Sequence, residues 1–265
     1  MNTLTKIKFL ILLFLINSIL IFSNQGENLL LRFSPPPNFD RLECERGSFG
    51  EFLRTLPLKN AYSDVKLYDG RTKSNKVWSA VFDIPILEKD LIQCADAVIK
   101  LRAEYLYQKK EFDKIVFTLT NKMVVPYKKF VEGYRVKING NRTFWVKTEK
   151  EGENRKVFDE YLEFIYNYSG TVSLTYDTFK VKIDEIEIGD IFLKSGNPGH
   201  CVIVVDLAKN KSGEKVMLLA QSYMPSQEIH ILKSFEPFSP WYKVEDKILK
   251  TPEWTFDKGS LRRFK

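Results

Sequence analysis

The chain has few of the residues that bind metals and none of the glycine-rich loops that bind phosphates. Its 265 residues include only two histidines, His200 and His230, and three cysteines, Cys44, Cys94 and Cys201. The two histidines stand too far apart in the sequence for a compact metal-binding motif. The sequence therefore predicts no metal site and no cofactor, and it leaves few candidates for nucleophilic chemistry.

A basic stripe of the kind that binds nucleic acid is also missing. The formal net charge is +7, but the lysines are scattered and alternate with acidic residues, as in the stretch 149–153. This pattern is typical of an ordinary solvated surface. We expect no nucleic-acid partner, and at most a weak attraction to peptidoglycan or another polymer of the cell envelope.

The first residues contain an apolar run that is short for a membrane-spanning helix. Lys6 and Lys8 precede an apolar run from Phe9 to Phe22, whereas a spanning helix needs about 20 apolar residues. A basic start, a short apolar core and a polar exit are typical of a secretory signal peptide. We expect residues 1–24 to be a signal peptide or, alternatively, an uncleaved anchor that is the only contact with the membrane. The protein is then exported to the periplasm or cell envelope.

The remainder divides into a proline-rich segment and one domain. Prolines in the stretch 34–38 disfavour both a helix and a central strand, so residues 25–45 are expected to be a tether. Residues 46–265 are expected to form a single α+β domain. Three cysteines in an exported chain leave at least one unpaired. A bridge between Cys44 and Cys201 and a fully reduced chain both remain open.

Periodicity places the main elements of this domain. Apolar residues at helical spacing predict a helix over about 91–107, with Asp90 as its N-cap and Gln93 in a capping box. A second helix is predicted over 156–166. Strands are predicted over 77–84, 114–120 and 142–147, and a hairpin over 200–207 and 216–223.

One cysteine and one histidine form the best candidate for chemistry. Cys94 lies in the first turn of the predicted helix, and a helix N-terminus and a nearby imidazole both lower the pKa of a thiol. His200 begins a strand, and Gln221 on the next strand is the first candidate to orient its ring. Alternation along the strand places Cys201 on the other face from His200. The competing interpretation is that Cys94 is a core residue and His200 a structural histidine.

Several aromatic residues could bind a substrate. Trp78, Tyr223, Trp241 and Tyr242 are candidates to line a cleft for a glycan or peptide, although such residues also form ordinary core. Gln93 is a weaker candidate near an oxyanion site.

Four sequence blocks resemble an exported bacterial family of unknown function. They are Gln93–Tyr107, Pro198–Asp206, Ala220–His230 and Thr251–Trp254, within a resemblance that spans about residues 45–265. It implies no activity.

A fainter resemblance is to NlpC-type cell-wall peptidases, which pair a helix-start Cys with a strand-start His. It implies a papain-like core in which a helix from the N-terminal half packs on an antiparallel sheet, with a β-rich insertion near residues 112–150. It also implies that Cys94 is the nucleophile, His200 the general base and acid, and Gln221 the orienting residue. This chain departs from that family because Gln93-Cys94-Ala95-Asp96 replaces the usual Asp-Cys-Ser-Gly.

Two functions follow from these residues. The first is a thiol hydrolase or amidase that acts on peptide or amide bonds in the cell envelope, for example in peptidoglycan. The second is a non-catalytic envelope module that binds a glycan or peptide in the same cleft.

The N-terminal residues give the first testable prediction. If they are a signal peptide, the mature protein begins shortly after residue 23 and fractionates with the envelope or the exported fluid. Mass spectrometry of the purified protein checks this. Recovery of intact protein from membranes with Met1 still present would instead identify an anchor.

Overall fold

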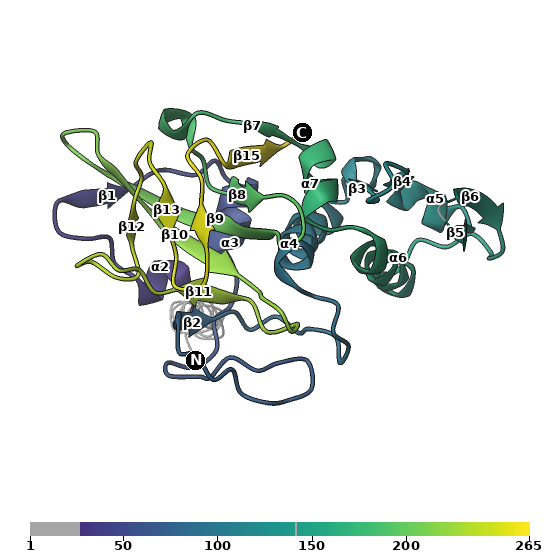
Figure 1. The fold of residues 1–265 in the computed structure, drawn as a ribbon, viewed down its shortest axis with the longest axis horizontal. Coiled ribbons are helices and arrows are strands. Elements are labelled where there is room, and N and C mark those ends of the chain that lie inside the picture. Colours follow the sequence, from purple (N-terminus) through teal and green to yellow (C-terminus); the bar gives the residue numbers. More distant parts are fainter. Residues whose placement is uncertain (1–26, 141) are drawn as a thin grey trace, which may run out of the picture.

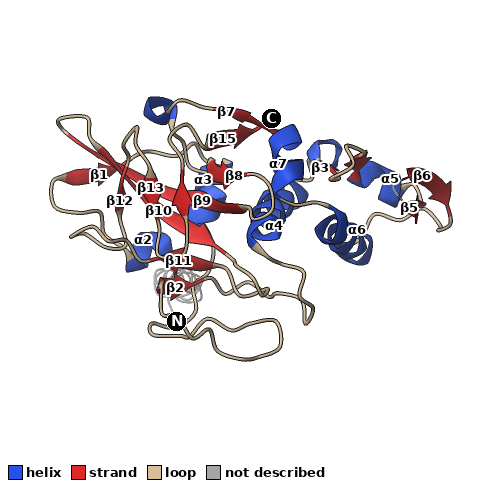
Figure 2. Ribbon diagram, viewed as in Figure 1, coloured by secondary structure: helices blue, strands red, loops and turns tan. Residues whose placement is uncertain are grey.

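The computed structural model describes residues 27–140 and 142–265. They form a mixed α+β structure around a nine-stranded sheet whose pairings are antiparallel (Figures 1 and 2). The main strand order is β2-β11-β10-β9-β8-β15-β7, while β1 pairs with β9 and β12 with β10. The strands of this sheet are β1 (Phe39–Arg41), β2 (Trp78–Val81), β7 (Thr178–Lys180), β8 (Ile191–Lys194), β9 (His200–Asn210), β10 (Lys215–Gln221), β11 (His230–Leu232), β12 (Tyr242–Lys243) and β15 (Leu261–Phe264).

The β9–β10 hairpin forms the centre of the sheet and confirms the predicted hairpin. Residues 200–208 of β9 are all buried, which explains why this strand reads as a continuous apolar run. Cys201, Ile203 and Val205 belong to one apolar cluster, and Val202 and Val204 belong to a second. Because side chains alternate along a strand, the sheet separates these two layers of core.

Helix α4 (Cys94–Gln108) packs against β9 and β10. The predicted helix is present, but the predicted N-cap at Asp90 is wrong because Gln93 occupies that position. The backbone N–H of Gln93 donates to the Asp96 carboxylate at 3.1 Å, as in a capping box. Asp90 instead accepts a hydrogen bond from the backbone N–H of Ser226, at 2.6 Å. Cys94 is therefore the first residue of the helix.

Residues 27–45 of the segment predicted to be a tether are part of the folded domain. Asn28 caps α2 (Leu29–Arg32), and Leu29 is fully buried. Strand β1 pairs with the end of β9, with Phe39 opposite Asn210. For residues 27–45 the prediction is wrong because the prolines occupy only the loop between α2 and β1, which leaves the flanking residues free to pair.

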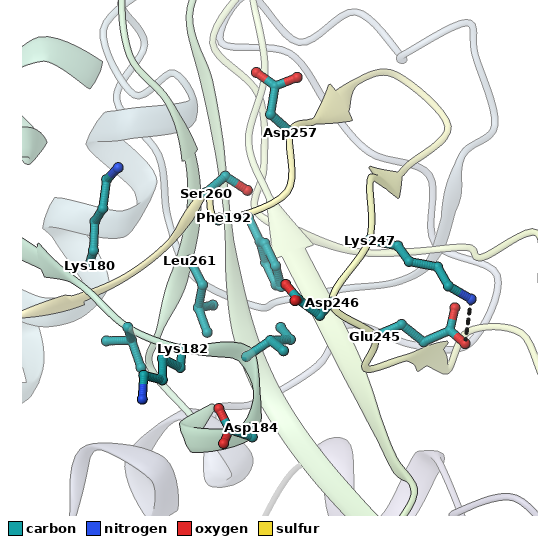
Figure 3. Close-up of a pocket in the computed structure, with 13 residues that line it drawn as sticks. Lys180, Lys182, Asp184, Phe192, Glu245, Asp246, Lys247, Asp257, Ser260 and Leu261 are labelled. Carbon is teal, nitrogen blue, oxygen red and sulfur yellow. Dashed lines mark hydrogen bonds and ion pairs between the residues drawn. The ribbon is translucent and has the colours of Figure 1, made fainter.

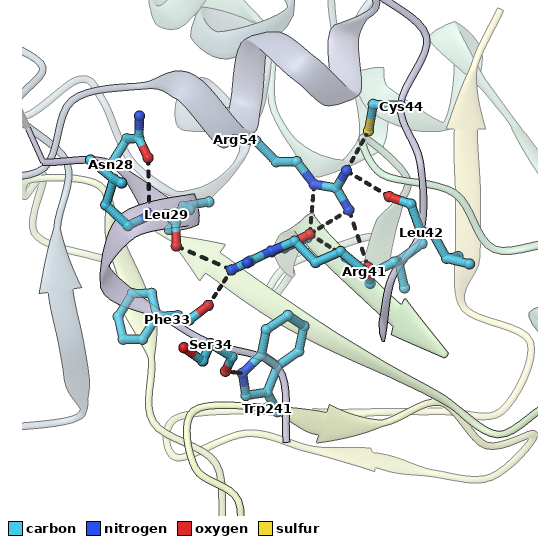
Figure 4. A network of polar contacts seen from close by, with 12 residues as sticks. Asn28, Leu29, Phe33, Ser34, Arg41, Leu42, Cys44, Arg54 and Trp241 are labelled. Carbon is cyan, nitrogen blue, oxygen red and sulfur yellow. Dashed lines mark hydrogen bonds and ion pairs between the residues drawn. The ribbon is translucent and has the colours of Figure 1, made fainter. Parts of the chain in front are cut away.

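A buried carboxylate holds this N-terminal segment to the sheet (Figure 4). Asp206 of β9 is fully buried and accepts from Arg54 Nε at 2.6 Å and from Arg41 Nε at 2.8 Å. Arg54 lies on the short helix α3 (Phe49–Thr55). Arg54 also donates to the Leu42 carbonyl at 2.7 Å and to the Cys44 sulfur at 3.0 Å. One carboxylate thus connects α3, β1 and β9.

The predicted β-rich insertion near residues 112–150 is partly helical. It consists of η1 (Phe112–Lys114), a β3 (Val116–Thr118) and β4 (Val124–Pro126) pair, α5 (Tyr127–Val131), and a β5 (Tyr134–Asn139) and β6 (Arg142–Lys147) pair. It lies to one side of the main sheet, beside α6 (Arg155–Tyr168), which is the second predicted helix. The chain then continues through α7 (Thr171–Asp177), η2 (Ile183–Glu185) and a final hairpin of β13 (Leu249–Lys250) and β14 (Thr255–Phe256).

Within the described residues, the structure contains no helix that is both long and apolar enough to cross a membrane. The segment predicted to be a signal peptide, residues 1–24, lies outside the described residues.

The buried ion pairs predict a large effect of substitution at Asp206. Asp206→Asn leaves two arginines, 6% and 21% exposed, without their counter-ion. Loss of one partner of such a group costs about 3–5 kcal/mol of the free energy of unfolding. Denaturant unfolding of the purified protein measures this.

The matched control is Asp257→Asn, because the Asp257–Lys194 pair is solvated, with both side chains at least half exposed. Exposed pairs contribute about 0–1 kcal/mol. An equal, small loss in both variants would contradict the role assigned to Asp206.

Candidate active site

The local fold places Cys94 at the start of a buried helix. It is the first residue of α4 and is 6% exposed. The first backbone N–H groups of a helix have no partner within the helix, and its dipole favours negative charge there. Two residues further on, burial raises the pKa of Asp96, and charge on Cys94 raises it further. Asp96 is thereby biased towards its neutral form, which limits its repulsion of a thiolate.

His200 is held at the start of β9 with one ring nitrogen bonded. Its Nε2 lies 2.8 Å from Gln221 Oε1, and both side chains are 1% exposed. The ring packs against Tyr223, Trp254 and Phe256, with centroids 4.9, 5.2 and 5.8 Å away. Because Nε2 is bonded to Gln221, Nδ1 is the ring nitrogen that remains for the thiol.

A glycine fixes the path of the chain into His200. A Cβ atom at Gly199 would lie 2.4 Å from both the Gly196 carbonyl oxygen and the Thr171 hydroxyl. No side chain fits at this distance, so the close approach of the backbone at this point requires glycine. The hydroxyl of Thr171 also donates to the Gly196 carbonyl at 3.2 Å. The loop before His200 is therefore tied to the start of α7.

The surroundings of Cys94 favour its ionised form. A hydrogen bond from the Cys201 thiol, followed by the hydrogen bond and charge of His200, outweighs the effect of burial and lowers the pKa of Cys94 to about 4. Burial and the charge of Cys94 raise the pKa of Cys201 well above its ordinary value, so Cys201 keeps its proton. The three cysteines are all free, and Cys94 is the one that can react as a thiolate.

A series of hydrogen bonds continues from His200 through Gln221 to Glu253 and Lys73. Gln221 Nε2 donates to Glu253 Oε2 at 2.7 Å and lies 3.5 Å from His230 Nε2. The other Glu253 oxygen accepts from Lys73 Nζ at 2.6 Å. Burial lowers the pKa of His230 to about 3, so this ring is neutral.

Sequence reasoning did not identify Lys73, His230, Glu253 or Trp254 as part of the site. A signal was present, because Thr251-Pro252-Glu253-Trp254 was one of the blocks that carried the family resemblance. This block is the turn between β13 and β14. The Thr251 hydroxyl closes the turn, donating to the Trp254 carbonyl at 3.0 Å. A single sequence cannot show that this turn reaches β10.

The loop before α4 is held to the end of β10. The Ser222 hydroxyl lies 2.8 Å from the Ile92 carbonyl, two residues before Cys94. The Gln93 side chain donates to Asp90 at 3.1 Å, so it is engaged with Asp90 and does not support the weak prediction of an oxyanion role. The loop thus fixes where the helix begins relative to His200.

The predicted aromatic cleft is wrong as a single surface. Tyr223 does contact His200, and Trp78 lies beside His230 at 6.4 Å between ring centroids. Trp241 and Tyr242 are each 3% exposed. Their polar atoms bond inward, to the carbonyls of Ser34 and Lys233. These two aromatics therefore stabilise the core, and Trp254 takes the place beside His200.

A separate hollow of about 390 Å³ lies beside β7, β8 and β15 (Figure 3). Its rim carries charges of both signs, from Lys180, Lys182, Asp184, Glu245, Asp246, Lys247 and Asp257. Phe192 lines it, and Phe256 lies between Phe192 and His200, 6.3 and 5.8 Å from their ring centroids. This hollow is therefore distinct from the Cys94 site. Among the described residues, no cluster of His, Cys, Asp or Glu is arranged to hold a metal ion.

The family model described as a domain of unknown function (4846) matches residues 29–263. The chain belongs to this family. The match confirms the resemblance to a family of unknown function, and its range includes the N-terminal segment that pairs with β9. No curated protein and no solved structure matches this member of the 4846 family.

The lowered pKa of Cys94 predicts an unusual pH dependence of alkylation. The thiolate is the reactive form, so the rate of reaction with iodoacetamide should stay nearly constant from pH 9 down to about 6 and be lost as the pH falls through about 4. At about pH 5.5 Cys94 should react about tenfold faster than an ordinary thiol. About 1,000-fold more thiolate is offset by about 100-fold lower nucleophilicity.

Mapping the adduct by mass spectrometry at each pH measures the rate. The denatured protein is the control, and there the rate should rise about tenfold per pH unit below pH 8. The same steep rise in the folded protein would contradict the lowered pKa.

Proposed function

We propose that the protein is a cysteine hydrolase of the cell envelope that cleaves peptide or amide bonds. The observation that carries this is the placement of Cys94 at the start of α4, with its pKa lowered by Cys201 and His200. A nucleophile, a base in contact with it and a third group that orients the base are the parts of an acyl-transfer site. Gln221 supplies the third group through its 2.8 Å bond to His200.

The arrangement supports a two-step reaction. The Cys94 sulfur attacks the carbonyl carbon, and as the C–N bond breaks, protonated His200 gives its Nδ1 proton to the leaving nitrogen. An amine departs and a thioester remains on Cys94. Water then attacks the thioester carbon and gives a proton to His200 Nδ1, and the C–S bond breaks to release the carboxylic acid. The N–H groups of Cys94 and Ala95, at the start of α4, have no partner within the helix and are suited to stabilise the oxyanion in both steps.

The proposal includes a papain-like, NlpC-type core, and two features of the fold support it. A helix with cysteine at its start packs on an antiparallel sheet whose strand β9 begins with histidine. The inserted segment near residues 112–150 accounts for the long separation between the two residues. Removal of the expected signal peptide takes away Lys6 and Lys8 and lowers the net charge from +7 to +5. With export and this modest positive charge, the proposed substrate is an amide bond in an envelope polymer such as peptidoglycan.

A second candidate is a non-catalytic envelope module that binds a glycan or peptide. Cys94 is only 6% exposed, and the His200 ring is enclosed by Tyr223, Trp254 and Phe256. Such burial is also what a packed core cysteine has.

The discriminating experiment measures both thiol reactivity and product release. We expect Cys94 to be alkylated in the folded protein and the protein to release new carboxyl and amino ends from purified peptidoglycan. Cys94→Ser should lower that release at least about 1,000-fold. Cys44 and Cys201 are internal references, because burial raises the pKa of both. Alkylation of Cys94 only after denaturation would favour the binding module.

A base variant needs a stability check. His200 is 1% exposed, so His200→Ala leaves a cavity in the core. His200→Gln retains more of the volume. It should lower product release by about the same factor as Cys94→Ser, with little change in thermal unfolding.

A further inference from the structure

We infer that Glu253 is a positioning residue, which acts through the Gln221 amide to set which nitrogen of His200 carries the proton. The catalytic meaning of this role rests on the proposed function. The position of the proton on the His200 ring can, however, be measured without any reaction. Glu253 does not contact Cys94 in this scheme. Its effect passes through two hydrogen bonds of 2.7 and 2.8 Å.

The direction of the Gln221 amide follows from what its neighbours can donate and accept. An ionised carboxylate only accepts hydrogen bonds, and an ammonium group only donates them. Lys73 Nζ lies 2.6 Å from Glu253 Oε1, and the two side chains are 8% and 10% exposed. The pair sets the Glu253 carboxylate directly against an ammonium group in a nearly dry place. Its other oxygen therefore requires the NH₂ group of Gln221, and the amide oxygen must then face His200.

His230 holds the amide in the same direction. Its Nδ1 lies 2.8 Å from the Glu228 carbonyl oxygen, which can only accept, so Nδ1 carries the proton of this neutral ring. Its Nε2 then has a lone pair, 3.5 Å from Gln221 Nε2. A reversed amide would place its oxygen against that lone pair and against the Glu253 carboxylate. Both neighbours thus oppose reversal.

The consequence for His200 is a fixed tautomer. Because Gln221 Oε1 accepts, His200 Nε2 must carry a proton, and in the neutral ring Nδ1 keeps its lone pair. Since Nε2 is occupied by Gln221, Nδ1 is the nitrogen left for the reaction at Cys94. A neutral His200 is thus ready to take a proton from water during thioester hydrolysis. A reversed amide would favour the Nδ1-protonated tautomer. Its Nδ1 has no lone pair, so it could not accept a proton from that water.

The sharpest test is Glu253→Gln, which changes charge and hardly changes volume. Lys73 only donates, so the carbonyl of the introduced amide should stay with Lys73 and its NH₂ group should face Gln221. Two NH₂ groups cannot bond to each other, so Gln221 is expected to reverse. In a Cys94→Ala background at about pH 8, His200 is not paired with a thiolate, and ¹⁵N NMR of labelled histidine reads its tautomer directly. The chain has only two histidines, so the spectrum is simple.

We expect His200 to be almost wholly Nε2-protonated in the Cys94→Ala protein and at least tenfold enriched in the Nδ1-protonated form after Glu253→Gln. The matched control is Glu228→Gln. Glu228 also forms an ion pair with a lysine and is also 10% exposed, but its side chain forms none of the bonds to Gln221. This control should leave the tautomer unchanged.

Two further variants keep the test decisive. The double variant Gln221→Glu with Glu253→Gln restores an acceptor-only group beside His200 without changing net charge, and it should restore the Nε2-protonated form. If Glu253→Gln does not fold, Glu253→Ala removes the acceptor and should give a mixture of both forms.

An unchanged His200 tautomer in the folded Glu253 variants would overturn the inference, even if Cys94 proves to be reactive. A shifted tautomer together with an unreactive Cys94 in the wild type would support the inference and overturn the proposed hydrolase instead.

Discussion

The antiparallel pairing of β9 with its neighbours is the constraint on which the site and the fold depend. One edge of this strand pairs with β8 near its start and with β1 near its end, and the other edge pairs with β10. Because side chains alternate along the strand, one layer receives α4 and the other receives the aromatic residues around His200. A slip of one residue would exchange these layers. The register of β9 therefore fixes both the core and the contact between Cys94 and His200.

Two buried carboxylates attach segments from the two sides of the sequence, around residues 41–54 and 253, to this central hairpin. Asp206 on β9 binds Arg41 and Arg54 from the N-terminal segment. Glu253, near the C-terminus, reaches Gln221 on β10 and is neutralised by Lys73. Buried charges are costly unless they are paired and hydrogen-bonded, and each of these has both. These ion pairs fix the positions of the attached segments more specifically than apolar packing alone would.

The sequence allowed the local elements to be predicted where periodicity was strong. The helix containing Cys94, the hairpin containing His200, and the neighbouring Gln221 all follow from spacing of apolar residues within short windows. The N-cap was misplaced by three residues because Asp90 and Gln93 both suit that role, and only the contact of Asp90 with Ser226 decides between them. The prolines around Pro36 suggested a tether because composition does not show that Phe39 pairs with Asn210. Glu253 and Lys73 were missed for the same reason, since their contact joins segments far apart in the chain.

Because Glu253 lies in the turn between β13 and β14, the site around His200 can be completed only late in synthesis. The hydrogen bonds that link His200 to Lys73 through Gln221 and Glu253 join distant parts of the sequence. They can form only after Glu253, which is near the C-terminus, has been made. While the ribosome is still making the later strands, Cys94 has neither His200 nor Cys201 beside it, and its thiol has the pKa of a cysteine in an unfolded peptide. During synthesis Cys94 is thus an ordinary thiol that is mostly protonated at neutral pH. Only the completed fold assembles the groups that keep this thiol ionised.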